Sequence, residues 1–356
     1  MRAAVLREHG RTPAIEAVQL AALAPGEVVV RIAGVGICHT DLTAIDGHVP
    51  LPLPAVLGHE GSGVVQQVGP DVIHLAAGDH VVLSYDRCEH CQRCATGRFA
   101  YCENFGALNS SGARLDGSTT LLQEAGPVHG SFLGQSSMAT HAIASERNAV
   151  KVDSDADLRL FGPLGCSMLT GAGAVFAELR PQPGESVAVF GCGAVGLAAV
   201  MAARSLDPSQ LVAIEPRADR RALALALGAD VALDPATDKL PRNVDVAIET
   251  VGTEAVIGAM LKLLASPGRG VTVGFHGPRN PITIDQGKLL FGRTLSGVIE
   301  GGSDPHELIP RLLALRSAGG FAFEQMITEY PFDELDRAIT DTRSGDAVKA
   351  VLVPDA

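Results

Sequence analysis

A glycine-rich turn between two short apolar runs, near the middle of the chain, restricts the fold more than any other stretch. The first run, 186–190, reads Ser-Val-Ala-Val-Phe, the turn, 191–196, reads Gly-Cys-Gly-Ala-Val-Gly, and the second run is 211–215. Short β-branched runs are typical of buried strands in a parallel sheet. Glycines let such a turn approach a pyrophosphate, to which the following helix offers its free N–H groups.

An acid closes the second apolar run. Glu215 lies close to the spacing of about 20 residues at which an acid binds the adenosine ribose hydroxyls. The turn by itself would also fit a structural loop, but strand, turn, helix, strand and acid in this order favour a dinucleotide site. The candidate cofactor-binding residues here are Gly191, Gly193, Ala194, Val195, Gly196 and Glu215.

The pattern after this turn alternates between short apolar strands and longer amphipathic segments. Such alternation predicts an α/β fold with a doubly wound parallel sheet. We expect further strands at 231–233, 244–249, 271–275 and 294–299, and helices at 218–227 and 255–265.

Composition restricts the class of protein and its partners. The chain has 356 residues, 46% of them hydrophobic, which is enough for two globular domains. Its 28 basic and 40 acidic residues give a net charge of -12, which disfavours nucleic acid as a partner. No apolar run reaches the roughly 18 residues of a membrane span. Since the start of the chain has no signal-peptide core, we expect a cytoplasmic protein with reduced thiols.

Four closely spaced cysteines form the most specific motif. Cys88, Cys91, Cys94 and Cys102 follow the pattern Cys-x2-Cys-x2-Cys-x7-Cys. Four thiolates so spaced can close a tetrahedron around one zinc ion and leave no open position for chemistry. An iron–sulfur cluster or redox thiols are the alternatives, but the last spacing is seven rather than three, and Glu103 rather than proline follows.

Three further residues are of the types that bind zinc. Cys38 opens Cys-His-Thr-Asp, His59 lies in Gly-His-Glu, and Cys166 follows Gly165. Thiolate and imidazole are ligands that zinc prefers. Each residue alone is also compatible with a blander interpretation, as a buried thiol or a satisfied core histidine.

Together these motifs resemble the zinc-dependent medium-chain alcohol dehydrogenases along nearly the whole chain. Segments 134–140 and 162–171 are most similar to the bacterial aryl (benzyl) alcohol dehydrogenase branch. The resemblance implies a β-rich, GroES-like catalytic domain formed by 1–155 and 299–356, with a structural zinc lobe at 86–104. It also implies a dinucleotide-binding Rossmann domain at 156–298, with the active site in the cleft between the domains.

The resemblance implies a catalytic zinc with three protein ligands, Cys38, His59 and Cys166. Asp41 would orient His59, and Glu60 would lie behind the metal as a transient ligand. Both acids could instead be ordinary buried, hydrogen-bonded groups. Thr40 matches the family hydroxyl that takes the alcohol proton.

Two positions depart from the common family pattern. Thr43 replaces the histidine that ends the proton relay, and His39 replaces an arginine that binds phosphate. His48, five residues after Thr43, is our candidate for the missing relay group, although a solvent-facing loop histidine fits equally well. The exit route of the proton is therefore open.

The family also implies contacts to the cofactor. Thr170 and Val195 would flank the nicotinamide, and Lys349 would meet a phosphate, unless it is a plain surface lysine. Glu215 argues for NAD, because a carboxylate repels a 2′-phosphate. Arg217 and Arg220 weaken this argument, since an arginine nearby could receive that phosphate.

We therefore predict an NAD-dependent alcohol dehydrogenase with two zinc ions per subunit that oxidises bulky primary alcohols, aryl or terpenoid. The alternatives are a family member acting on a secondary alcohol, a polyol or a glutathione adduct, and a nucleotide-sensing protein without turnover. Intact zinc ligands disfavour the last. The expected partner is a small alcohol or aldehyde, with neither nucleic acid nor membrane, and the family suggests a homodimer or homotetramer.

Overall fold

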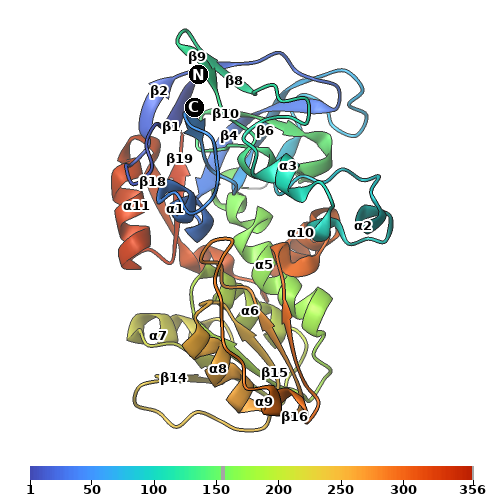
Figure 1. Ribbon diagram of the computed structural model, residues 1–356, viewed down its shortest axis with the longest axis vertical. Helices are drawn as coiled ribbons and strands as arrows, with labels where there is room; N and C mark the ends of the chain where they lie inside the picture. The colour runs from blue at the N-terminus through green and yellow to red at the C-terminus, as the bar shows by residue number, and fades with distance from the viewer. Residues whose placement is uncertain (154–156, 355–356) are drawn as a thin grey trace. The chain divides into compact units, whose positions relative to one another are not determined.

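The computed structural model describes residues 1–153 and 157–354, which form two compact units (Figure 1). The β-rich unit comprises Met1–Cys166, Asp304–Pro310 and Met326–Ala356, and the parallel-sheet unit comprises Ser167–Ser303 and Arg311–Gln325. The first predicted domain boundary, 155/156, lies outside the described residues. The functional division into a catalytic and a dinucleotide-binding domain stays a prediction.

The parallel-sheet unit contains a six-stranded sheet. Its order is β14-β13-β12-β15-β16-β17, and every neighbouring pair is parallel. In chain order this is 3-2-1-4-5-6, the doubly wound arrangement that binds a dinucleotide where the strand order reverses. The predicted α/β fold is confirmed. The strands are β12 Ser186–Phe190, β13 Gln210–Ile214, β14 Val231–Leu233, β15 Val244–Glu249, β16 Leu264–Thr272 and β17 Arg293–Gly297.

Helices connect most of these strands, and only β14 and β15 are joined by a described segment without a helix. The helix α6, which follows the glycine turn, is buried from Gly196 to Ala203, and alanine fills four of those eight positions. Small side chains let the helix lie close to the sheet, so that the free N–H groups of its first turn face the carboxyl end of β12. The helices of this unit are α5 Ser167–Gly173, which continues as a π-helix over Ala174–Leu179, α6 Ala194–Arg204, α7 Ala218–Ala226, α8 Glu254–Leu263 and α9 Gln286–Leu289.

One strand begins earlier than the sequence suggested. The prediction of 271–275 was wrong, because β16 already pairs with β15 at Leu264. Pro267 and Gly268 are residue types that disfavour the interior of a strand. The register explains the exception: Leu264 pairs with Val244 and Arg269 with Val246, so the proline and glycine lie in an irregular step between two regular pairings.

The β-rich unit is built on a seven-stranded sheet of order β11-β7-β6-β4-β19-β18, with β10 paired to β4. The C-terminal strand β19 returns to the N-terminal part of the chain, where Val351 pairs with Gly36. The strands are β4 Glu27–Gly36, β6 Gly61–Val68, β7 His80–Leu83, β10 His141–Ser145, β11 Ala149–Val152, β18 Ile327–Pro331 and β19 Lys349–Val353.

Two smaller sheets and short helices complete the description. One sheet contains β1 Arg2–Leu6, β2 Ala14–Ala17 and β5 Ala55–Val56, and the other contains β3 Gln19–Leu20, β8 Leu121–Gln123 and β9 Gly126–Val128. The α-helices are α1 His39–Ile45, α2 Gln92–Ala95, α3 Phe105–Asn109, α4 Leu158–Phe161, α10 Pro305–Ser317 and α11 Leu335–Ser344.

Among the described residues, no single helix is long and apolar enough to cross a membrane. One pair of helices, Leu158–Gly165 and Ser167–Leu179, reaches that length and composition only when its two members are counted together across a bend of 48°.

Candidate metal and dinucleotide sites

The predicted zinc ligands meet within the β-rich unit. One ligand atom from each of Cys38, His59, Glu60 and Cys166 lies within 4.8 Å of all the others. Cys38 is the N-cap of α1, His59 lies just before β6, and Cys166 follows the 3-10 turn Gly162–Gly165. These four residues are separated by up to 128 positions in sequence, so the fold alone brings them together.

Gly58 lets the chain just before His59 pack closely against Met138. Gly58 has φ +92°, and a Cβ atom there would lie 2.3 Å from the backbone nitrogen of Met138. A larger residue would push the segment that carries His59 away from its neighbour.

Asp41 fixes both His59 and the start of α1. Its Oδ1 accepts hydrogen bonds from His59 Nδ1 and from the Gly58 N–H, each at 3.0 Å. Its Oδ2 accepts from the Cys38 N–H at 2.9 Å. Burial disfavours the charged imidazole, but Asp41 raises the pKa of His59 well above its usual value. Because Asp41 accepts the Nδ1 proton, Nε2 is the ring nitrogen left for a ligand in the neutral imidazole.

The donor set fits zinc. His59 Nε2 is buried and makes no hydrogen bond with the protein, which is the expected state of a nitrogen that binds a metal. A hydrogen bond with Cys166 lowers the pKa of Cys38 well below that of a free thiol, against the effect of burial, and so favours the thiolate that zinc binds. Two sulfurs and one nitrogen leave a fourth position for an alcohol oxygen.

Lys349 has protein partners that the sequence did not indicate. Its ammonium is buried and donates to both Glu60 carboxylate oxygens, at 3.0 and 2.9 Å, and to the Ile37 carbonyl at 3.0 Å. Burial opposes the charge, but Glu60 raises the pKa of Lys349. Lys349 is therefore a buried ion-pair partner of Glu60 and not a surface lysine, and its contact with a cofactor phosphate stays a prediction.

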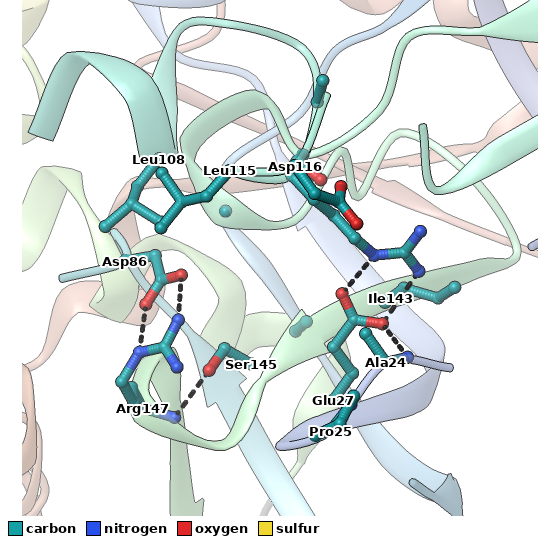
Figure 2. Close-up of a pocket in the computed structure, with 15 residues that line it drawn as sticks. Ala24, Pro25, Glu27, Asp86, Leu108, Leu115, Asp116, Ile143, Ser145 and Arg147 are labelled. Atoms are coloured by element: carbon teal, nitrogen blue, oxygen red, sulfur yellow. Dashed lines mark hydrogen bonds and ion pairs between the residues drawn. The ribbon is translucent and has the colours of Figure 1, made fainter. Parts of the chain in front are cut away.

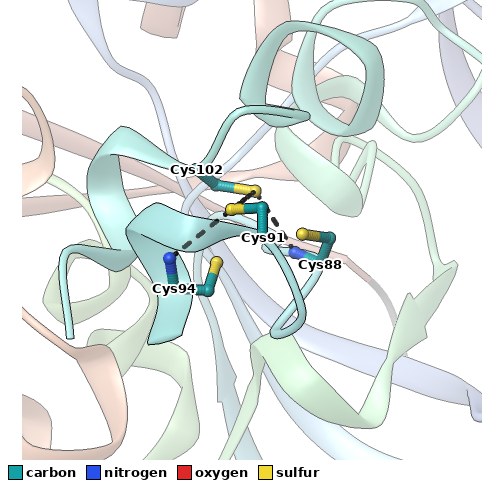
Figure 3. A group of neighbouring side chains, drawn as sticks. All are labelled: Cys88, Cys91, Cys94 and Cys102. Carbon is teal, nitrogen blue, oxygen red and sulfur yellow. Dashed lines mark hydrogen bonds between the residues drawn. The ribbon is translucent and has the colours of Figure 1, made fainter. Parts of the chain in front are cut away.

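The four-cysteine lobe is a second closed group of thiols (Figure 3). The Sγ atoms of Cys88, Cys91, Cys94 and Cys102 all lie within 4.8 Å of one another. Cys91 Sγ and Cys102 Sγ are 4.0 Å apart, close to the edge of about 3.8 Å of a tetrahedron with 2.3 Å zinc–sulfur bonds.

Backbone N–H groups support thiolates in this lobe. Cys91 Sγ accepts from the N–H groups of Cys94 and Glu103, and Cys102 Sγ accepts from that of Cys88, each at 3.4 Å. Burial opposes ionisation, but a hydrogen bond from Asn104 and nearby N–H groups lowers the pKa of Cys88 to about 6. Burial raises the pKa of Cys94 to about 12, so the fit to a structural zinc ion rests on the arrangement of the four sulfurs.

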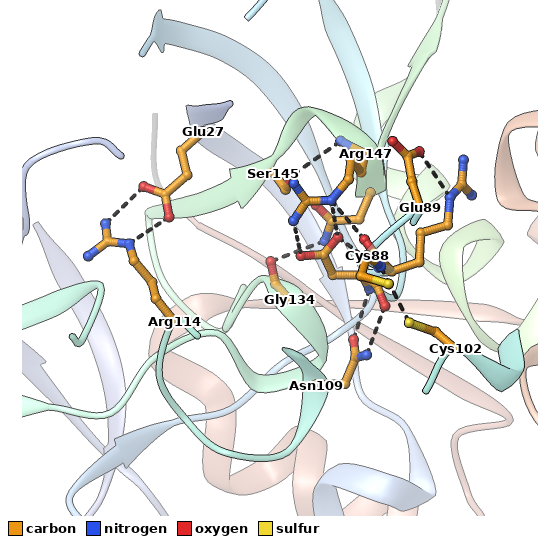
Figure 4. A network of polar contacts seen from close by, with 12 residues as sticks. Glu27, Cys88, Glu89, Cys102, Asn109, Arg114, Gly134, Ser145 and Arg147 are labelled. Atoms are coloured by element: carbon orange, nitrogen blue, oxygen red, sulfur yellow. Dashed lines mark hydrogen bonds and ion pairs between the residues drawn. The ribbon is translucent and has the colours of Figure 1, made fainter. Parts of the chain in front are cut away.

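Ion pairs hold the segment that leads into the lobe (Figure 4). Arg147 Nη2 lies 2.8 Å from Asp86 Oδ2 and its Nε donates to the Arg87 carbonyl at 2.8 Å. Arg87 in turn donates to Glu89 and lies over the Phe99 ring at 4.1 Å. This network fixes the residues immediately before Cys88.

A separate pocket in the same unit contains none of the predicted site residues (Figure 2). Its charged lining consists mainly of the Glu27–Arg114 and Asp86–Arg147 ion pairs. Because both guanidinium groups already bind carboxylates, neither is available to bind an anionic ligand in this pocket.

The glycine turn in the parallel-sheet unit has the geometry of a pyrophosphate cradle. Gly191 has φ +87°, which permits the tight turn after β12. A Cβ atom at Gly196 would lie 1.8 Å from the Gly191 carbonyl oxygen, so this glycine lets α6 approach the turn. At Gly193 a Cβ atom would meet nothing within 4 Å. The open space above Gly193, at the N-terminus of α6, fits a phosphate.

Glu215 locks this turn to the end of β13. Its carboxylate accepts from the Cys192 N–H at 2.8 Å and from the Arg217 N–H at 3.0 Å. The guanidinium of Arg217 is held by Asp219, and that of Arg221 donates to the Glu215 and Pro216 carbonyls. The acid therefore lies beside the cradle, as a ribose-binding carboxylate should.

The predicted proton-relay residues lie in or just after α1. Thr40 Oγ1 lies 3.8 Å from Cys38 Sγ, beside the ligand set. The hydroxyl of Thr43 donates to the His39 carbonyl at 2.8 Å, within α1. His39 and His48 are both exposed, and the His48 N–H donates to the Thr43 carbonyl. The relay role of His48 stays a prediction.

The remaining cofactor candidates lie in the parallel-sheet unit. Thr170 is a partly exposed residue of α5, and Val195 is a partly exposed residue of the first turn of α6. Arg220 lies on α7, where its charge and that of Arg221 act on the pKa of Cys192. Burial, first of all, and Glu215 raise the pKa of Cys192 to about 12, so this thiol of the turn is inert.

Sequence reasoning missed two contacts at the ligand set. One is the Glu60–Lys349 pair, which joins residues 289 positions apart. The other is Gln135, whose side chain is buried against the backbone of His59. A polar amide inside segment 134–140 was the available signal, because a buried amide requires partners.

Comparisons with known proteins agree with this geometry. Residues 24–154 match the family model described as alcohol dehydrogenase GroES-like domain, and residues 194–315 match zinc-binding dehydrogenase. A geraniol dehydrogenase of Castellaniella defragrans is 46% identical, with 99% of this chain and 97% of that protein aligned.

Solved structures of similar fold also bear alcohol dehydrogenase names. An alcohol dehydrogenase zinc-binding domain protein from Burkholderia ambifaria has a TM-score of 0.96 and 43% identity, covering 100% of this chain and 99% of its own. The benzyl alcohol dehydrogenase of Acinetobacter calcoaceticus has a TM-score of 0.94 and 37% identity, covering 99% of each chain.

Proposed function

Because the chain belongs to the zinc-dependent medium-chain alcohol dehydrogenase family, we propose that it oxidises bulky primary alcohols, aryl or allylic, reversibly to aldehydes with NAD. The observation that carries this proposal is the convergence of Cys38, His59 and Cys166 around the buried, unpartnered His59 Nε2. A scaffold without turnover has no use for such an open ligand set.

Zinc held by these three ligands would supply a Lewis acid for the alcohol oxygen, and NAD would supply the hydride acceptor. The residues of the chain orient the ligands, neutralise charge and move the proton. Asp41 holds His59 in one tautomer and orientation. The ammonium of Lys349 neutralises the buried carboxylate of Glu60 beside the ligands. The Thr40 hydroxyl, 3.8 Å from Cys38 Sγ, would relay the proton of the alcohol, accepting it while it gives its own proton on toward solvent.

The preference for NAD rests on Glu215. A carboxylate at the end of β13 accepts hydrogen bonds from ribose hydroxyls and repels a 2′-phosphate. The contact of Arg217 with Asp219 supports this preference, since that guanidinium group already has a partner. Arg220 stays the competing candidate for a 2′-phosphate.

The substrate class is supported by two relatives. A geraniol dehydrogenase and a benzyl alcohol dehydrogenase are similar over nearly the whole chain. Both names refer to a primary alcohol whose hydroxyl carbon is attached to an sp² carbon. An alcohol of this type yields a conjugated aldehyde, and we assign that class to this chain. Secondary alcohols, polyols and glutathione adducts are the competing substrates.

We also propose a homo-oligomer, a dimer or a tetramer, in the cytoplasm. The edge strand β17 ends the described parallel sheet, and Leu290 and Phe291 just before it are exposed by 69% and 71%. Unpaired strand edges and exposed apolar side chains favour association with a second copy. All seven cysteines are free thiols, as expected in a reducing compartment.

The test combines metal analysis with reduction of NAD in the presence of benzyl alcohol, geraniol, cyclohexanol or sorbitol. We expect two zinc ions per chain and a kcat/KM that is highest for benzyl alcohol or geraniol. Higher kcat/KM on cyclohexanol or sorbitol would contradict the substrate class, and two zinc ions without turnover of any alcohol would contradict the enzymatic role.

A further inference from the structure

A buried glutamine connects the segment of His59 with a neighbouring loop. Gln135 is 1% exposed, and its side chain makes three hydrogen bonds, all to backbone groups. Its Oε1 accepts from the Gly61 N–H at 3.0 Å, and its Nε2 donates to the His59 carbonyl at 2.9 Å. The second Nε2 proton is donated to the Ser84 carbonyl at 3.2 Å. One amide thus holds the backbone on both sides of Glu60.

Ser84 continues this connection to the segment of Cys166. Its hydroxyl is buried and donates to the Gly165 carbonyl at 2.6 Å. The two backbones are in direct contact there, because a Cβ atom at Gly165 would lie 1.9 Å from the Leu83 carbonyl oxygen. The position of Cys166 is therefore set against the chain at 83–84.

The two side chains form one continuous path. It runs from the His59 carbonyl through the Gln135 amide to Ser84, and through the Ser84 hydroxyl to the Gly165 carbonyl. We propose that Gln135 and Ser84 are positioning residues that fix the backbone of His59 relative to that of Cys166 and so hold two ligands of the catalytic metal in register. This inference rests on the proposed function, which supplies the metal.

The segment of Cys166 needs positioning groups of its own, because Asp41 binds only the other two ligand segments. Asp41 orients the ring of His59 and caps the segment of Cys38, and its three hydrogen bonds join these two segments rather than the backbone before Cys166. Small errors in ligand position matter, because a metal site requires its ligands within a few tenths of an ångström. Groups that hold the ligands typically account for about 10- to 100-fold in metal affinity or activity.

Two variants test the path, and one matched variant controls for lost hydrogen bonds. Gln135→Met removes three hydrogen bonds with a similar shape, and Ser84→Ala removes a single hydroxyl that the fold should tolerate. Asn109→Leu is the control, because Asn109 (Figure 4) is also fully buried. Its amide also makes three hydrogen bonds, but to Asp86 and Phe105.

The measurements are made on the full-length metal-loaded protein. The rate at which a chromophoric chelator removes the first zinc ion reports how firmly the catalytic site holds it, and the visible spectrum after cobalt replaces that ion reports ligand geometry. Urea unfolding places the three variants on one stability scale, so a change in the cobalt spectrum can be separated from general destabilisation.

We expect zinc release to accelerate about 10- to 100-fold in Gln135→Met, and less but measurably in Ser84→Ala. The cobalt bands should shift in both variants and stay at the wild-type position in Asn109→Leu. Wild-type release rates and spectra in both variants would overturn the positioning role, even if they unfold more easily. A wild-type protein that binds metal only in the cysteine lobe would overturn the proposed function, and this inference with it.

Discussion

Replacing Asp41 with asparagine should weaken the catalytic metal site while it preserves the shape of the side chain. Asp41 accepts three hydrogen bonds, from the N–H groups of Gly58 and Cys38 and from His59 Nδ1. An asparagine has one oxygen, so its NH2 group must face at least one N–H donor. If the oxygen keeps the two bonds to Gly58 and His59, the NH2 group meets the Cys38 N–H.

The magnitude follows from this count. One buried N–H left without an acceptor costs about 1–3 kcal/mol of folding free energy. The loss of the carboxylate that orients His59 should weaken metal binding about 10- to 100-fold, which corresponds to about 1.4–2.8 kcal/mol. We expect kcat/KM to fall by a similar factor, because fewer molecules carry the catalytic zinc ion and its ligand His59 is less well oriented.

The assay is competition for zinc with a calibrated chelator, combined with urea unfolding and kcat/KM for benzyl alcohol. Asp46→Asn is the matched control, because Asp46 is the C-cap of the same helix and its carboxylate binds the exposed Arg343 instead. The loss of this surface pair should cost at most about 1 kcal/mol and leave zinc affinity unchanged. Equal zinc affinities for Asp41→Asn and wild type would refute the orienting role of Asp41.

Three further predictions concern the parallel-sheet unit. Glu215→Ala should raise KM for NAD about tenfold or more, since hydrogen bonds to a charged group contribute about 1.5–3 kcal/mol; an unchanged KM would reject the ribose contact. Gly193→Val should abolish NAD binding, measured by calorimetry, without lowering the unfolding midpoint, because its side chain enters open space; retained binding would remove the phosphate from that space. Cys192, whose pKa is raised to about 12, should resist iodoacetamide at pH 8 even after chelation exposes the zinc-binding thiols, as read by mass spectrometry; rapid labelling would contradict its burial.

The strands and the ligand candidates could be predicted because their signals are local. The turn at 191–196 and the four cysteines of the lobe carry their spacing within a few residues. The start of β16 could not be found in this way, since a proline and a glycine interrupt its pattern and only pairing with β15 reveals the strand.

The contacts that were missed at the site have a different cause. The Glu60–Lys349 pair was missed because its two residues lie 289 positions apart. Gln135 and Ser84 were missed because their hydrogen bonds go to backbone groups, which leave no mark on the sequence at 59, 61 or 165. Such contacts follow from the tertiary fold, not from any spacing.

Zinc-edge anomalous diffraction from crystals of the purified protein tests most directly whether Cys38, His59 and Cys166 hold one metal ion. We predict two peaks per chain, one bonded to these three residues and one among the four cysteines of the lobe. A single peak in the lobe, from crystals grown with zinc present, would contradict the account.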